Sequence, residues 1–275
     1  MKATRLISRV VVTISLAGVG TLLQQPTTVH ATTLRQETKR INAHNKKTER
    51  QINALQRKIN QLNKKLTNYQ QQTQTTSPER HNTSELAALT YRGENEVLVN
   101  NNQPSFSATD LATDHGGWQT FSNLDALNRV GAANVLLNQS MMPTAKREGL
   151  TWNPTGWHNK RIKSGWLYNR SHLIGYQLTG ENNNPKNLMT GTRQLNAPEM
   201  LAHESDIAYY LKKHPNRFVR YRVTPIFNDN ELLARGVQME GQSVGDNSIQ
   251  FNTYIFNVQD GVTLNYADGT SQIAK

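Results

Sequence analysis

The sequence predicts an α+β protein with a central, mostly antiparallel β-sheet, preceded by a basic N-terminal helix that resembles a coiled coil. Three observations predict this class. Short runs rich in β-branched and aromatic residues succeed one another in the second half of the chain. Other segments carry apolar residues at helical spacing. Residues 32–72 contain neither glycine nor proline, which favours one long helix.

The first 31 residues resemble a secretory signal. Lys2, Arg5 and Arg9 give a basic start, and an apolar run from Val10 to Leu23 follows, short for a membrane span. Val29-His30-Ala31 offers a small-residue cleavage site. The expectation is therefore a secreted protein, with a retained signal anchor and cell-surface association as alternatives. The absence of cysteine excludes disulfides and thiolate metal sites and fits a Gram-positive exported protein.

Residues 32–72 have the pattern of a basic helix with a heptad seam. Leu34, Ile41, Leu55, Leu62 and Tyr69 share one heptad position, and Ile52, Ile59 and Leu66 share another. The seam predicts possible self-association of the chain. Packing against the globular part, lying on an anionic surface and serving as a solvated stalk are alternatives. Residues 73–83, TQTTSPERHNT, are expected to be a linker.

Residues 84–275 are expected to form the globular domain, with the following elements in order. We expect a short helix or strand lead-in at 85–91, a strand at 96–100 and a helix at 124–139. A hairpin is expected over 152–170, ending in a short strand at 166–168, followed by a helix from about Pro198. The last expected elements are strands at 217–227, 232–239, 249–258 and 262–266, with a turn at Asp268-Gly269.

The charge pattern points to a polyanionic partner. The formal net charge is +11, and residues 32–72 alone contribute +8. Within the otherwise neutral remainder, residues 146–222 also carry +8, which the flanking segments balance. A positive region inside a neutral domain is typical of a cleft that binds nucleic acid.

The stretch from Gly165 to Glu204 gathers residues suited to phosphodiester chemistry. His172 can accept a proton from water at neutral pH. Asn196 offers a neutral oxygen ligand of the kind that Mg²⁺ accepts, and a hydrated cation would stabilise charge on phosphate. Glu204 follows eight residues later, so on a continuous helix it would lie roughly 80° from Asn196 and border the same site. Alone, such a histidine is more often structural, and the asparagine-rich loop at 181–187 more often forms turns.

The stretch resembles the DNA/RNA non-specific endonuclease family with the ββα-metal fold, in particular secreted streptodornase-type DNases and DNA-entry nucleases. The family's Asp-Arg-Gly-His motif corresponds to Asn169-Arg170-Ser171-His172, so Asp and Gly are replaced here. The resemblance implies that His172 is the general base, Arg170 lies near phosphate, and Asn187 is a second active-site asparagine. It also implies that Asn196 is the metal ligand and that Glu204 holds metal-bound water. Arg193 is a further candidate for phosphate binding.

The resemblance implies a metal-dependent endonuclease acting on DNA and RNA, using Mg²⁺, with Mn²⁺ as a second candidate and no small-molecule cofactor. Two competing hypotheses belong to other classes. One is a non-catalytic surface protein that binds nucleic acid through the basic helix. The other is an adhesion protein that uses its basic charge on anionic cell-wall or lipid polymers. The set of His172, Asn187 and Asn196 argues against the first, because binding alone would not require it, and a nicking assay run beside a DNA-binding assay separates all three hypotheses.

Overall fold

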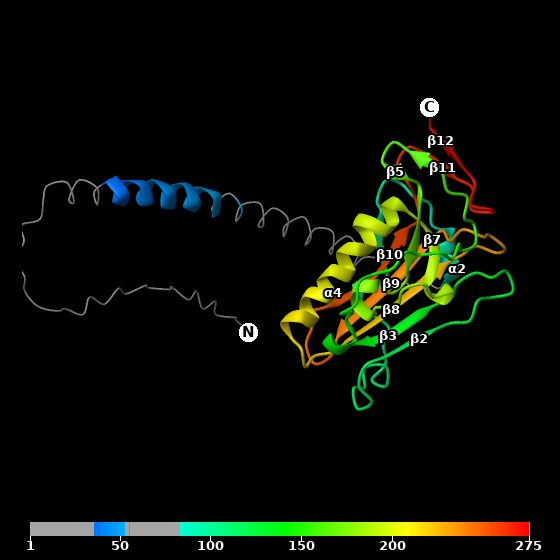
Figure 1. Cartoon of the computed structure of the whole chain (residues 1–275), viewed down its shortest axis with the longest axis horizontal. Coiled ribbons are helices and arrows are strands. Elements are labelled where there is room, and N and C mark those ends of the chain that lie inside the picture. Colours follow the sequence, from blue (N-terminus) through cyan, green and yellow to red (C-terminus); the bar gives the residue numbers. More distant parts are fainter. Residues whose placement is uncertain (1–35, 53–54, 56–82, 275) are drawn as a thin grey trace, which may run out of the picture. The chain divides into compact units, whose positions relative to one another are not determined.

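The computed structural model describes residues 36–52, 55 and 83–274, in two parts that are treated separately below (Figure 1). In the first part, residues 36–52 and 55 are helical, as expected. Ile41, Ile52 and Leu55 of this helix are 58%, 57% and 61% exposed. These apolar side chains are not buried within the described helix itself, and self-association through the seam stays a prediction.

Other expectations fall wholly or partly on residues that the structure does not describe. The signal at 1–31, most of the seam beyond Leu55 and the linker at 73–82 lie outside the described residues. Among the helices that are described, no segment has the length and apolar character needed to cross a bilayer.

The second part is built on a six-stranded antiparallel sheet in the order β1-β10-β9-β8-β3-β2. This confirms the expected mostly antiparallel central sheet. Its strands are β1 (Glu96–Leu98), β2 (Trp118–Phe121), β3 (Ala133–Leu137), β8 (Val219–Ile226), β9 (Gly236–Ser243) and β10 (Gln250–Phe256).

Three two-stranded hairpins and several short helices complete this part. The hairpins pair β4 (Arg161–Ile162) with β5 (Gly165–Trp166), β6 (Tyr168–His172) with β7 (Leu188–Thr192), and β11 (Val262–Leu264) with β12 (Ser271–Ile273). The helices are α2 (Thr83–Ala88), α3 (Tyr176–Thr179), α4 (Leu201–Lys213) and 3-10 turns at Asn100–Asn102, Gln139–Met141 and Pro185–Asn187.

One face of the sheet is covered by α4 and the segments around β6 and β7, as the yellow helix crossing the strands in Figure 1 shows. Ile207 and Leu211 of α4 are fully buried in the same cluster as Tyr221 of β8 and Met239 of β9. Because β8 alternates apolar and polar residues, Val219, Tyr221 and Val223 face this core while its arginines face the other way.

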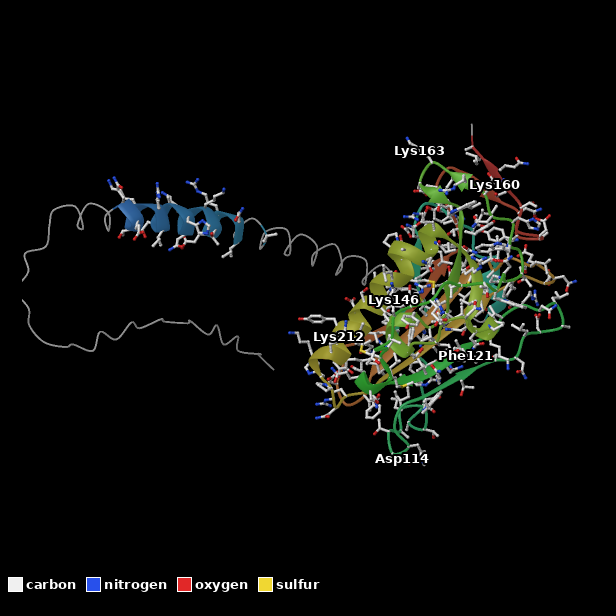
Figure 2. All side chains as sticks on the ribbon, in the orientation of Figure 1. Asp114, Phe121, Lys146, Lys160, Lys163 and Lys212 are labelled. Carbon is white, nitrogen blue, oxygen red and sulfur yellow. The ribbon has the colours of Figure 1, made fainter. Side chains whose placement is uncertain are left out.

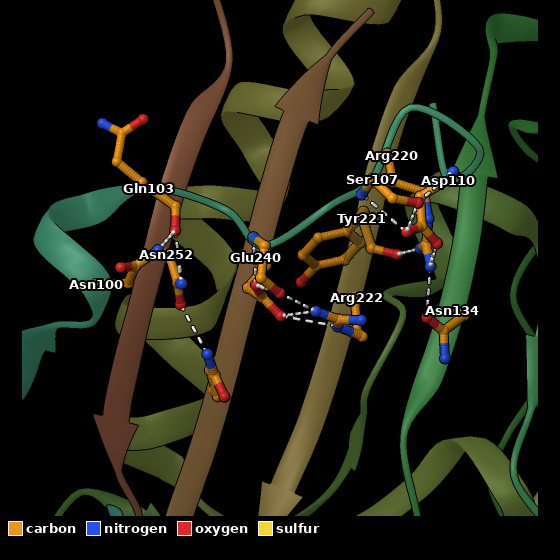
Figure 3. A network of polar contacts seen from close by, with 12 residues as sticks. Asn100, Gln103, Ser107, Asp110, Asn134, Arg220, Tyr221, Arg222, Glu240 and Asn252 are labelled. Atoms are coloured by element: carbon orange, nitrogen blue, oxygen red, sulfur yellow. Dashed lines mark hydrogen bonds and ion pairs between the residues drawn. The ribbon is translucent and has the colours of Figure 1, made fainter. Parts of the chain in front are cut away.

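The opposite face carries a polar network. Arg222 donates to Glu240 Oε2 at 2.8 and 2.5 Å, and Arg220 donates to Asn134 Oδ1 at 2.6 Å (Figure 3). The Arg220 guanidinium also lies 4.6 Å from the centre of the Phe106 ring. Arg220 and Arg222 therefore share the face of β8 that lies opposite the core of Val219, Tyr221 and Val223. Their partners show that both serve this network, so they add no free positive charge to a cleft on the α4 side.

The predicted helix at 124–139 is wrong. Asp125 Oδ1 accepts hydrogen bonds from the backbone N–H groups of Leu127 and Arg129, which folds this stretch into a turn with Asn128 at φ 59°. Residues Ala133–Leu137 then form β3 between β2 and β8. The apolar spacing that suggested a helix also contains the alternation of a strand, and pairing in the sheet decides between them.

Two local expectations near the motif are also corrected. The short strand expected at 166–168 is divided between β5, which ends at Trp166, and β6, which begins at Tyr168, includes Asn169 to His172 and pairs with β7. Asn196 and Glu204 do not lie on one continuous helix, because Ala197 is extended at φ −153°, ψ 120° and α4 begins only at Leu201. The predicted strand at 232–239 begins four residues later, at Gly236.

Candidate active site

His172 is the last residue of β6, and the chain after it is held by a buried asparagine. Asn187 Oδ1 accepts from the backbone N–H of Ile174 at 2.9 Å, and its Nδ2 donates to the carbonyl of Ile174 at 3.0 Å. Its own carbonyl accepts from the N–H of Leu173. Asn187 is fully buried and does not line the cavity described below. It therefore fixes the main chain next to His172 instead of facing the site directly.

The surroundings of His172 define its tautomer. Its Nε2 lies 2.6 Å from the carbonyl oxygen of Asn182. A carbonyl only accepts, so Nε2 carries the proton and Nδ1 keeps the lone pair. Burial lowers the pKa of His172 to about 4, and the positive charge of Arg147 adds to this. At neutral pH the imidazole is therefore uncharged and has one basic nitrogen.

Arg147 lies next to that nitrogen, with its guanidinium 3.4 Å from His172 Nδ1. No carboxylate in the part of the chain that the structure describes lies within ion-pairing distance of Arg147. Its positive charge thus remains available to an anion that reaches Nδ1. Sequence reasoning missed Arg147, because it sits in the irregular segment AKREGL and only tertiary contact connects it to the motif.

Glu204 is in the first turn of α4 and is 7% exposed. Burial raises the pKa of its carboxyl to about 8, although the backbone N–H of Gly175 donates to it. A Cβ at Gly175 would lie 2.2 Å from Glu204 Oε2, so the carboxyl occupies the space that glycine leaves. Within the described residues no ion pair neutralises this carboxyl. The positive charge of Arg147 acts on this carboxyl from beyond ion-pairing distance, and a bound cation would stabilise its charged form further.

Asn196 reaches the same cavity from the irregular turn Leu195–Met200. It is half-buried, and no described group makes a hydrogen bond to its side-chain amide. An uncommitted amide oxygen beside a buried carboxyl is a donor set that suits a hard, oxygen-preferring cation. The described residues contain no cluster of three His, Cys, Asp or Glu side chains for a metal, so a cation here would rely on few protein ligands and on water.

These residues line one cavity of about 1140 Å³. His172, Asn196, Glu204, Arg170 and Arg147 all contribute to its wall. Of the six candidates from the sequence, four meet here. Asn187 is buried behind the site, and Arg193 is exposed and is not among the lining residues.

Arg170 is held rigidly at the edge of the cavity. Its Nε donates to the carbonyl of Trp152 at 2.8 Å, and its Nη2 donates to Asn153 Oδ1 at 2.6 Å. The guanidinium also lies 4.6 Å from the ring centre of Trp157. None of these partners is a carboxylate, so the charge of Arg170 is positioned but not neutralised.

Comparisons with known proteins show which family this part of the chain is similar to. Residues 109–245, which contain every candidate named above, match the model of a family described as DNA/RNA non-specific endonuclease. A deoxyribonuclease of Streptococcus dysgalactiae subsp. equisimilis is 33% identical over 107 residues, which are 38% of this chain and 32% of that relative. The match therefore spans about a third of the relative's length.

Solved structures of NucA from Streptococcus agalactiae are similar as well. The form with no metal bound is 27% identical with a TM-score of 0.60, covering 72% of this chain and 97% of NucA. The form with a magnesium ion bound is 28% identical with a TM-score of 0.58, covering 64% of this chain and 85% of NucA.

Proposed function

We propose that the chain is a secreted, divalent-metal-dependent endonuclease that hydrolyses phosphodiester bonds in DNA and RNA, because residues 109–245 match the DNA/RNA non-specific endonuclease family model. The likeness to a deoxyribonuclease and to NucA supports DNA as a substrate. The observation that carries the proposal is the meeting of His172, Asn196 and Glu204 in one cavity.

In this proposal His172 is the general base. Nδ1 accepts a proton from water, the water oxygen attacks phosphorus in line, and the bond from phosphorus to the 3′ oxygen breaks. The Asn182 carbonyl keeps the proton on Nε2, so the basic nitrogen is the one beside Arg147. Asn187 acts as a positioning residue, because it fixes the backbone that follows the base.

Asn196 and Glu204 are the residues that would hold the cation, directly or through water. Mg²⁺ suits their oxygen donors, and Mn²⁺ is a second candidate. When bound, a divalent cation supplies positive charge against the phosphate oxygens and the departing 3′ oxygen. The NucA form with magnesium bound supports a cation of this type.

Arg147 and Arg170 would contact the oxygens of the phosphate bound in the cavity. Both guanidinium groups line the cavity, and neither is paired with a described carboxylate. Arg193 is too far out on the surface to act at the same phosphate and would contact flanking backbone. Contacts to phosphate and metal carry no sequence information, which supports cleavage without sequence specificity.

The test is a plasmid-nicking assay of the full chain with and without EDTA, run beside DNA binding. We expect cleavage that EDTA abolishes. His172→Ala should lose about 10²–10⁴-fold in rate and retain DNA binding, since only proton transfer is removed. His115→Ala is the control, because the His115 side chain is 88% exposed and does not line the cavity. A His172→Ala rate within a few-fold of the parent would contradict the assignment.

The metal ligand is tested separately with Asn196→Ala. Losing an oxygen donor should raise the Mg²⁺ concentration needed for half-maximal rate, and excess Mg²⁺ should recover part of the activity. Asn196→Asp should lower that concentration, because a carboxylate binds the cation more tightly. An identical Mg²⁺ dependence in both variants and the parent would show that Asn196 is not a ligand.

A further inference from the structure

The β4–β5 hairpin contributes one exposed side chain, the tryptophan Trp166, to the lining of the active-site cavity. Trp166 lines the cavity and is 47% exposed. Its cross-strand partner is Arg161, whose guanidinium lies 4.3 Å from the indole ring centre. Arg161 therefore covers one face of the indole. A large apolar ring left this open beside a polar site is not explained by packing of the core.

The hairpin that carries this pair is held in place by the domain. Ile162 and Trp157 pack against the buried cluster of Leu167, Tyr168 and Leu233. The Asn159 side chain exchanges two hydrogen bonds of 2.9 Å with the backbone of Tyr168. The position of the indole relative to the cavity is therefore largely preset, which lowers the entropy cost of binding a ligand on it.

The surroundings of the hairpin are positively charged. Lys163 stands at the tip of the turn and points away from the ribbon (Figure 2). The Arg193 guanidinium lies next to Gly165, 3.7 Å from the point a Cβ there would occupy. Residues 149–180 contain no Asp or Glu at all. A flat aromatic ring bordered by lysine and arginine suits a ligand with a flat ring joined to a phosphate backbone.

Resting on the proposed nuclease function, we propose that Trp166, backed by Arg161, stacks an unpaired nucleobase of the strand whose phosphate lies at His172. In a duplex both faces of each base are already stacked on neighbours, so this platform is open only to single-stranded or locally melted nucleic acid. Every base has a stacking face, so the contact selects for strandedness and not for sequence. The hairpin therefore makes single strands the preferred substrate class.

The experiment measures equilibrium binding in EDTA. Every protein tested is the full chain and carries His172→Ala, so that no strand is cut. The probes are a fluorescent single-stranded oligonucleotide and the duplex of the same sequence. Trp166→Ala should weaken single-strand binding on the order of tenfold and leave duplex binding within about twofold. Trp166→Phe, which keeps an aromatic face, should restore most of the loss.

Tyr209→Ala is the matched control. Tyr209 is also an exposed aromatic, 65% exposed on α4, with the Lys213 ammonium 5.6 Å from its ring, but it does not line the cavity. It should leave both affinities unchanged. Parental single-strand affinity in Trp166→Ala overturns the proposal, as does an equal loss on both probes. If the chain with His172 intact cuts neither probe when Mg²⁺ is added, while the His172→Ala chains keep the selective binding, the nuclease function is refuted and the platform is not.

Discussion

The geometry around His172 depends on single atoms contributed by distant parts of the chain. The Asn182 carbonyl sets the tautomer, Arg147 lies at the basic nitrogen, and Gly175 leaves room for the Glu204 carboxyl. Each contact is specific enough that a change of one side chain has a defined consequence.

Gly175→Ala should damage the site through Glu204. The new Cβ would lie 2.2 Å from Oε2 and 2.6 Å from Cδ of a carboxyl that is buried and has little room to move. We expect a loss of about 1–3 kcal/mol in the free energy of unfolding and a reduced rate of cleavage. Combining it with Glu204→Asp, which shortens the acid by one methylene, should recover part of the stability.

Gly149→Ala is the control, since a Cβ there meets nothing within 4 Å. Denaturant unfolding of the parent and these three variants tests this, and an unaffected Gly175→Ala would contradict it.

The pH dependence of cleavage should report the lowered pKa of His172, which is about 4 because of burial and of Arg147. The base is competent only when neutral, so kcat/KM should be flat with respect to this group near neutrality and fall as pH drops through about 4. Arg147→Gln removes a charge that opposes protonation, so its acid limb should move to higher pH. Initial rates on a short oligonucleotide, with the fold checked by circular dichroism at each pH, give the profile. An acid limb that stays at the parental pH in Arg147→Gln would show that Arg147 does not act on this base.

At the scale of elements, α2 belongs to the catalytic part of the chain. Leu86 is fully buried and Ala87 nearly so, in a cluster with Tyr254 and Phe256 of β10. The short helix therefore covers the face of the sheet opposite α4. A domain boundary drawn at residue 84 would cut into this helix, which begins at Thr83.

Leu86→Ala should lower the free energy of unfolding by about 2–5 kcal/mol, because it leaves a cavity in that cluster. Leu98→Ala on β1 is the control, since Leu98 is 40% exposed and should cost much less. Urea unfolding midpoints at constant m-value measure both. Equal midpoints for Leu86→Ala and the parent would mean that α2 does not stabilise the domain.

The elements that the sequence predicted well are those whose local pattern and tertiary role agree. The strand at 217–227 alternates cleanly and became β8, and the run at 249–258 became β10. Residues 124–139 fit both a helix and a strand, and only the pairing of β3 with β8 resolves the ambiguity.

In the site, His172 and Asn196 follow from motif spacing. Arg147 and the Asn182 carbonyl are placed by tertiary contact, which no local pattern carries. Asn187 matched the motif, but its buried position behind the base depends on the turn that follows β6.

For the whole molecule, a strongly basic segment lies outside the part of the chain that carries the candidate catalytic residues. The candidate catalytic residues all lie within 109–245, whereas residues 32–72 contribute +8 to a formal net charge of +11. Where this segment is described, it is an exposed helix with lysines and arginines among its outer residues. Such a segment can strengthen binding to long nucleic acid without touching the scissile phosphate.

A truncated chain beginning at Ser77 keeps α2 and removes the basic helix. We expect it to cut short DNA at close to the parental rate and to bind long duplexes more weakly, with the difference shrinking as salt rises. Each lost phosphate contact should reduce the slope of log K against log salt by roughly 0.9, because fewer counterions are released. A full-length variant with Lys39, Arg40, Lys46 and Lys47 changed to Gln is the matched control, since it removes charge from the described helix without removing the segment. It should shift the slope in the same direction. Binding is measured on one long duplex with His172→Ala in every chain. Equal slopes for parent and truncation would assign the helix to self-association or to a stalk, because a segment that contacts phosphate cannot be removed without changing counterion release.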